Sequence, residues 1–224
     1  MLFRSTTGGG GGGGSSKGSS GYDSFYSTDA TPVPSAPDQP SYVPMAKFSD
    51  VPYSHWANPY VEDLSGKGIV SGDGNGLFYP ERNLTRAEYV KMAVLAFGLY
   101  DANAVSEFTD CRSGAWYDSY VASGVNAGII SGMGNGIFAP DAFISRQDMA
   151  VIALRCLELS GKVDVQPDDA GFADDALIAD YAKDAVYIMK AMNIINGMGD
   201  GSFSPSSNAT RAMASKVIDL LMQA

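Results

Sequence analysis

The chain has 224 residues, of which 45% are hydrophobic and 18% are charged, a composition typical of a globular protein rather than a disordered or fibrous one. Its formal net charge is −10 with only 15 lysines and arginines, which argues against a nucleic-acid backbone as its partner. No apolar run reaches the roughly 18 residues that a membrane helix needs, so we expect no membrane insertion.

Residues 1–45 are rich in glycine, serine and proline and show no helical or strand periodicity. We expect a flexible linker here, followed by one folded domain over 46–224. The start, Met1 to Thr7, is too short and too polar for the apolar stretch of a signal peptide, so we expect no export signal in it. A tether without a domain in front of it suggests either a piece of a longer protein or a start codon assigned too far downstream.

From Phe48 onward the sequence repeats itself three times, over about 48–99, 108–160 and 172–222. The residues that recur at constant spacing in the first two copies are Phe48, Trp56, Gly72, Gly76, Phe78, Pro80 and Arg86, then Phe108, Trp116, Gly132, Gly136, Phe138, Pro140 and Arg146. The third copy is looser and carries one residue inserted in its first helix. Units this small cannot bury their apolar faces alone, so we expect them to pack into one domain with approximate threefold symmetry.

The first half of each copy is predicted to form a short helix that ends in a glycine-rich turn. In the first copy Asn58-Pro59 is typical of a helix cap followed by proline at the first helical position. The turn, at 72–80 in the first copy, has glycine at alternate positions, which permits positive φ angles and a tight reversal. This spacing fits neither an EF-hand loop nor a dinucleotide fingerprint, so we expect no metal and no cofactor.

The second half of each copy is predicted to form a longer helix. In the first copy this helix opens at Thr85, whose spacing to Glu88 has the capping-box form. The second copy opens in the same way at Ser145, and the third at Thr210, where a methionine replaces the acid and predicts a weaker cap.

An arginine stands in the first turn of the second helix in every copy, at Arg86, Arg146 and Arg211. A helix start favours anions, so a cation there is unfavourable by about 0.3–1 kcal/mol. In one interpretation, each arginine pairs with an acidic neighbour such as Asp50, Asp110 or Asp174. In the other, its planar guanidinium and the free N–H groups of the helix start form a site for a carboxylate.

Reactive side chains are few. If the protein is extracellular, Cys111 and Cys156 either form a disulfide or remain two buried thiols, and the sequence leaves both alternatives open. His55 is the only histidine and is expected at the surface, and no spacing of acids indicates a catalytic pair. We therefore expect a protein that is not an enzyme.

These segments resemble the S-layer homology (SLH) family. The resemblance covers about 48–221 and rests on Phe48-Ser49-Asp50-Val51, His55-Trp56-Ala57, the Gly-x-Gly-Asn-Gly-x-Phe-x-Pro turn and Leu84-Thr85-Arg86-Ala87-Glu88. It implies an all-α fold in which three helix-turn-helix repeats form a pseudo-threefold helical bundle with three prongs. The third copy departs most from the pattern, because it lacks the tryptophan and the glutamate.

The resemblance also implies a binding site, because family members bind secondary cell-wall polysaccharide, often pyruvylated, in grooves between neighbouring prongs. The implied ligand-binding residues are Arg86, Arg146, Arg211, Asp50, Asp110, Asp174, Trp56, Trp116 and, as the nearest substitute in the third copy, Tyr181. Each has a structural alternative. The aspartates are equally suited to capping the turn that follows them, and tryptophans at such positions more often close a small core.

The function that follows is non-covalent anchoring of a secreted or surface-layer protein to an acidic, pyruvylated polysaccharide of the bacterial cell wall, outside the cell. Several weak grooves on one rigid body would add avidity. Two alternatives remain: a protein-binding or self-assembly module that contacts other surface-layer proteins, and a glycan-modifying enzyme.

Overall fold

The computed structural model describes residues 45–161, 163, 165–167 and 171–224, which belong to one compact unit of the chain. Its elements are α1 Asn58–Gly66, α2 Arg86–Ala96, α3 Asp118–Asn126, α4 Arg146–Leu159, the 3₁₀-helix η1 Asp175–Leu177, α5 Asp180–Ala191 and α6 Arg211–Gln223. Between residues of these ranges there are isolated β-bridges but no strands, so the predicted all-α class is confirmed. Apart from Met45, the predicted linker lies outside the described residues.

No helix in the described part of the chain is long and apolar enough to cross a membrane.

The three longer helices that follow the turns begin where their caps predict. Thr85 accepts a hydrogen bond from the N–H of Glu88 (3.2 Å), and the Glu88 carboxylate accepts one from the N–H of Thr85 (2.9 Å), which confirms the capping box. Ser145 and Thr210 cap α4 and α6 through their hydroxyl groups. The cap predicted at Asn58 is wrong, because α1 already includes this residue and its side chain donates to the carbonyl of Val51 (2.8 Å).

The glycine-rich turns adopt the predicted conformation. Gly74 and Gly76 have φ angles of 85° and 86°, and the corresponding glycines of the other copies are also positive. Gly72 does not need a positive φ, but a Cβ there would lie 2.5 Å from the carbonyl oxygen of Leu77. Each turn buries its phenylalanine, and the three are Phe78, Phe138 and Phe203.

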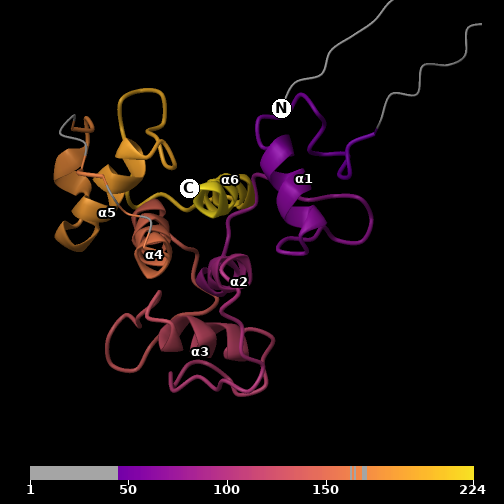
Figure 1. The fold of residues 1–224 in the computed structure, drawn as a ribbon, viewed down its shortest axis with the longest axis vertical. Coiled ribbons are helices and arrows are strands. Elements are labelled where there is room, and N and C mark those ends of the chain that lie inside the picture. Colours follow the sequence, from indigo (N-terminus) through magenta and orange to yellow (C-terminus); the bar gives the residue numbers. More distant parts are fainter. Residues whose placement is uncertain (1–44, 162, 164, 168–170) are drawn as a thin grey trace, which may run out of the picture. The chain divides into compact units, whose positions relative to one another are not determined.

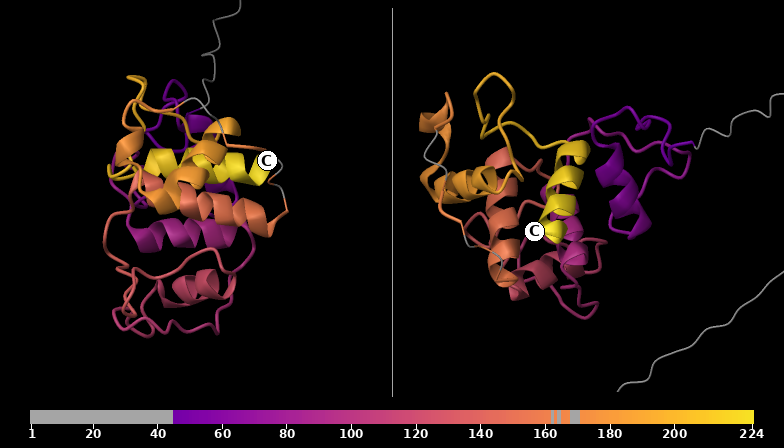
Figure 2. Two further views of the ribbon diagram at one scale, coloured as in Figure 1. Left: turned by 90° about the vertical axis from the view of Figure 1, so that its left-hand side faces the viewer. Right: turned by 45° about the horizontal axis from the view of Figure 1, so that its top comes forward.

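The helices interlock the repeats in a ring. The second helices α2, α4 and α6 contact one another at the centre (Figure 1). Each first helix packs on the second helix of the preceding repeat, α3 on α2, α5 on α4 and α1 on α6, and the right-hand view of Figure 2 shows the last pair side by side. Among the described helices, no first helix contacts the second helix of its own repeat. The third repeat therefore closes onto the first.

The extended segments before the central helices form a closed cycle of backbone hydrogen bonds. The N–H of Leu84 donates to the carbonyl of Ala209 (2.9 Å), that of Ala209 to Ile144 (2.9 Å), and that of Ile144 to Leu84 (3.0 Å). All three residues are buried, where an unpaired backbone group would be costly. Because each segment satisfies the next, the centre of the domain needs all three repeats.

A buried carboxylate lies at the seam between α1 and α6. Asp219 is 3% exposed, and its Oδ1 atom has no hydrogen-bond partner among the described residues. The equivalent position of the second repeat holds Leu154, which is apolar. Burial and the neighbouring Asp63 carboxyl raise the pKa of Asp219 to about 6. The ionised form is therefore disfavoured in the folded domain.

Replacing Asp219 by leucine is expected to raise the free energy of unfolding at neutral pH by about 1–3 kcal/mol, because an unsatisfied buried group is removed. The folded pKa of about 6 lies above the ordinary value, so the native state binds the proton more tightly. The free-energy cost of ionising buried Asp219 is thus absent below about pH 4, grows as the pH rises and is complete above the folded pKa. Urea unfolding of both proteins across this range measures the difference, and a pH-independent gap would contradict the assignment.

Candidate functional site

The three arginines reach away from their own helices into the next repeat. The Nε atom of each donates to the carbonyl of a turn phenylalanine, Arg86 to Phe138 (2.9 Å), Arg146 to Phe203 (2.8 Å) and Arg211 to Phe78 (2.9 Å). Each guanidinium also lies over the ring of the same phenylalanine, with its Cζ atom 4.3 to 5.0 Å from the ring centroid. These contacts join the repeats head to tail.

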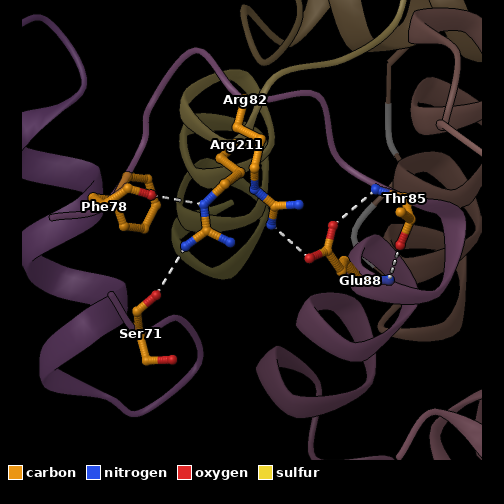
Figure 3. A network of polar contacts seen from close by, with 6 residues as sticks. All are labelled: Ser71, Phe78, Arg82, Thr85, Glu88 and Arg211. Carbon is orange, nitrogen blue, oxygen red and sulfur yellow. Dashed lines mark hydrogen bonds and ion pairs between the residues drawn. The ribbon is translucent and has the colours of Figure 1, made fainter. Parts of the chain in front are cut away.

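A second bond fixes the plane of two of the guanidinium groups. Nη2 of Arg211 donates to the carbonyl of Ser71 (2.8 Å), as Figure 3 shows, and Nη2 of Arg146 donates to that of Asn196 (3.1 Å). Arg146 is 4% exposed, and burial lowers the pKa of its guanidinium without making it neutral at physiological pH. The third nitrogen, Nη1, is weakly bound or unbound. Nη1 of Arg146 donates to the weak acceptor Sδ of Met213, and Nη1 of Arg211 has no hydrogen-bond partner among the described residues.

The carboxylate site predicted at the helix starts needs correction. The first N–H of α2, that of Arg86, donates to the carbonyl of Ala142 (2.8 Å), and the N–H of Ala87 donates to that of Pro140 (3.1 Å). Equivalent bonds join α4 to the third repeat and α6 to the first. The amide donors at the helix starts are therefore occupied, which leaves the guanidinium groups as the cationic donors of these positions.

The other interpretation, in which the arginines pair with Asp50, Asp110 or Asp174, is also wrong, because no such ion pair occurs among the described residues. Of these three arginines, Arg86 has an acid within ion-pair distance among the described residues, but it is Asp148, whose Oδ2 lies 3.6 Å from Nη1 of Arg86.

The three aspartates hold the turns of their own repeats. Asp110 accepts hydrogen bonds from the N–H groups of Phe138 (2.9 Å) and Ala139 (2.7 Å), and Asp50 and Asp174 make the same pair of bonds. Ala139 has a φ of 59°, which is strained for a residue with a Cβ, and its two equivalents share this conformation. Partial burial raises the pKa of Asp110, but the two amide donors outweigh it and leave that pKa lowered. Both carboxylate oxygens are engaged within the turn.

The predicted aromatic residues are exposed rather than buried. Trp56 is 50% exposed, Trp116 54% and Tyr181 62%. The interpretation of these tryptophans as core residues is therefore wrong, because the interlocked helices already fill the centre and leave the indole rings at its rim. Tyr181 donates its hydroxyl proton to Asp148 (2.8 Å), and burial together with this bond raises the pKa of Tyr181 to about 12.

The arginines and the aromatic residues meet in three grooves, which we name after their arginines. The Arg211 groove is about 250 Å³ and is lined among others by Arg211, Ser71, Glu88, Lys91 and Trp116. The Arg86 groove is about 420 Å³ and includes Arg86, Ser131, Asp148, Val151, Arg155 and Tyr181. The Arg146 groove is about 160 Å³ and includes Arg146, Asn196, Met213, Lys216 and Trp56.

Each groove needs all three repeats. It takes its arginine from one repeat, a turn and a central helix from the next, and its aromatic residue from the one after. The sequence-predicted arginines and aromatic residues are thus brought together, whereas Asp50, Asp110 and Asp174 lie behind the turns and line none of the three. Lys91 and Lys216 were missed, although an alignment of the repeats places both at one position of the second helix.

The remaining reactive groups lie outside the grooves. Cys111 and Cys156 are buried free thiols, the second of the two predicted alternatives, and burial raises the pKa of Cys156 to about 12. His55 accepts a hydrogen bond from the N–H of Ala57 (3.1 Å). In the part of the chain that the structure describes, no cluster of histidine, cysteine and acidic residues could hold a metal ion.

Comparison with known proteins identifies the repeats. The sequence profile of the S-layer homology domain matches residues 47–90, 107–150 and 171–214. The chain is 34% identical over 172 residues to an S-layer protein sap of Bacillus anthracis, which covers 76% of this chain and 20% of that protein. It is 32% identical over 176 residues to an endoglucanase of a Bacillus species (strain KSM-635), covering 78% of this chain and 18% of the relative.

A third relative is an amylopullulanase of Thermoanaerobacterium thermosulfurigenes, 33% identical over 177 residues, which are 79% of this chain and 9% of that protein. The chain therefore spans a fifth or less of the length of these three relatives.

Proposed function

Since the chain belongs to the S-layer homology domain family, we propose that it anchors a surface protein to the bacterial cell wall by binding an acidic wall polysaccharide without a covalent bond. The same three-repeat segment occurs in relatives named as S-layer proteins and in others named as glycan-cleaving enzymes. A segment common to such different proteins supports attachment rather than catalysis. The location that follows is outside the cell, at the wall or in a surface layer.

One observation carries this proposal: each groove combines an arginine, held by a hydrogen bond from Nε to a turn carbonyl, with a half-exposed aromatic ring. The ring offers an apolar face to a sugar while its edge stays in water. The guanidinium is held through Nε, while Nη1 has only the weak acceptor Sδ of Met213 in Arg146 and no hydrogen-bond partner among the described residues in Arg211. A ligand can therefore bind Nη1 without further loss of side-chain freedom. A carboxylate on the sugar, such as that of a pyruvyl ketal, completes its hydrogen bonds.

The test uses the tryptophans, because the arginines also hold the fold. Trp56→Ala and Trp116→Ala are each expected to weaken binding to purified, pyruvylated wall polysaccharide about tenfold. Tyr53→Ala is the matched control, since Tyr53 is a 56% exposed aromatic residue that lines none of the three grooves. Removing the pyruvyl groups from the polysaccharide is expected to weaken binding at least as much.

Co-sedimentation with wall sacculi stripped of polysaccharide is the experiment that can contradict this proposal. Anchoring by glycan requires that the protein no longer sediments with stripped sacculi. Equal sedimentation with stripped and intact sacculi would contradict the proposal and would favour contacts with other surface proteins.

A further inference from the structure

The three grooves differ at one position of the central helix. Lys91 lines the Arg211 groove and Lys216 lines the Arg146 groove, whereas the Arg86 groove has Val151 at the equivalent position. The Nζ atom of Lys91 lies 5.8 Å from the centre of the Trp116 ring, so that cation and aromatic face adjoin. The same combination of arginine, lysine and tryptophan recurs in the Arg146 groove with Trp56.

In the Arg86 groove, the arginine already has an acidic partner. Asp148 lies 3.6 Å from Nη1 of Arg86 and also accepts the hydroxyl proton of Tyr181 at 2.8 Å. The further cation of this groove, Arg155, donates to the hydroxyl of Ser131 at 3.5 Å. An anion entering this groove would have to compete with a carboxylate that is already bound to the arginine.

In the other two grooves, no acid among the described residues forms an ion pair with the groove arginine. In the Arg146 groove Met213 stands where Asp148 stands in the Arg86 groove. In the Arg211 groove Glu88 is bound instead to Arg82 (2.5 Å) and to the N–H of Thr85 (2.9 Å), as Figure 3 shows.

Across the described residues, no ion pair joins Lys91, Lys216, Arg146 or Arg211 to an acid. Two cations that line one groove without a directly paired acid repel each other at short range, although the net charge of the whole chain is −10. An anionic ligand between them removes that repulsion.

Building on the proposed function, we infer that the Arg211 and Arg146 grooves are the two anion-binding sites of this domain, and that the Arg86 groove does not bind an anionic sugar. The ligand is a saccharide with one anionic substituent, held between Nη1 of the arginine and the lysine ammonium, with its ring on the tryptophan. This assignment does not follow groove volume, because the Arg86 groove, whose arginine is already paired with Asp148, is the largest of the three.

Isothermal titration calorimetry with a monosaccharide that carries a pyruvyl ketal tests this inference, because a small probe reports each groove separately. The wild type is expected to bind two equivalents. Lys91→Val and Lys216→Val, which copy the residue of the Arg86 groove, are each expected to abolish one of them, and the double variant both. These lysines are half-buried at the surface, so circular dichroism is expected to show an unchanged fold.

Two further arms make the result decisive. The methyl ester of the probe, which has the same shape without the charge, is expected to bind at least tenfold more weakly. A hexose phosphate distinguishes the source of the charge, and binding of this compound without binding of the pyruvylated sugar would overturn the carboxylate assignment.

Three equivalent sites, or lysine variants that bind like the wild type, would overturn the two-groove inference. That failure is separable from failure of the proposed function, in which the wild type would not bind intact wall polysaccharide at all.

Discussion

Replacing Arg146 by alanine is expected to lower the free energy of unfolding by about 3–5 kcal/mol. Arg146 is 4% exposed, and its guanidinium donates to the carbonyl groups of Phe203 (2.8 Å) and Asn196 (3.1 Å), which belong to the next repeat. Its removal leaves the buried carbonyl of Phe203 and the partly buried one of Asn196 without this donor and opens a cavity against the phenylalanine ring. Urea unfolding followed by circular dichroism measures the loss.

Arg155→Ala is the matched control, because this arginine lies on the same helix, is half-buried and makes one long hydrogen bond of 3.5 Å. We expect a change of less than about 1 kcal/mol there. Arg146→Lys keeps the charge but not the planar fork, and is expected to fall between the two. Similar losses for Arg146→Ala and Arg155→Ala would contradict the role of Arg146 as a clamp between repeats.

Replacing Asp110 by alanine is expected to destabilise the domain by about 2–3 kcal/mol. The change removes two charge-assisted hydrogen bonds, to the N–H groups of Phe138 (2.9 Å) and Ala139 (2.7 Å), and partial exposure of the carboxylate keeps the effect moderate. Ala139 then holds its φ of 59° without that support. Adding Ala139→Gly to the variant is expected to recover about 1 kcal/mol, because glycine adopts this conformation without strain.

The pH dependence of this loss has a defined sign. The pKa of Asp110 is lowered in the folded domain, so its contribution to stability is present above the unfolded pKa near 3.9 and is lost as the pH falls through the folded value. The gap between wild type and Asp110→Ala is therefore expected to close in acid. Asp141→Ala, which removes an exposed acid, is the control and is expected to change stability by less than about 0.5 kcal/mol. A gap that persists at low pH would indicate a role other than accepting these two bonds.

The candidate site was only partly predictable. Repetition singled out the arginines and the tryptophans, and the family resemblance assigned the tryptophans a role in binding. The partners of these residues could not be predicted from the sequence, because residues such as Arg211 and Phe78 meet in space although 133 positions separate them in the chain. The lysines were overlooked because a cation on a predicted helix is ordinarily a solvated side chain. Whether such a lysine lines a groove depends on which groove its helix borders, and only the packed structure shows this.

The prediction that the three repeats pack around one core is confirmed, but their mode of packing was beyond the sequence. A helix, a turn and a helix suggest a hairpin whose two helices touch. In the described structure the first helix of each repeat packs on the preceding repeat instead. The tryptophans, interpreted as core residues, are displaced to the surface by this interlocking.

By itself the sequence determined the features that arise within a few residues of chain: the capping box that Thr85 and Glu88 form at the start of α2, and the turns whose glycines have positive φ. These follow from local backbone and side-chain chemistry, which a single segment contains in full. Only the tertiary structure decided which groups meet across repeats, including the partners of the arginines and the separate character of the three grooves. Such contacts depend on how the ring closes, because each groove is assembled from three segments that the chain keeps far apart.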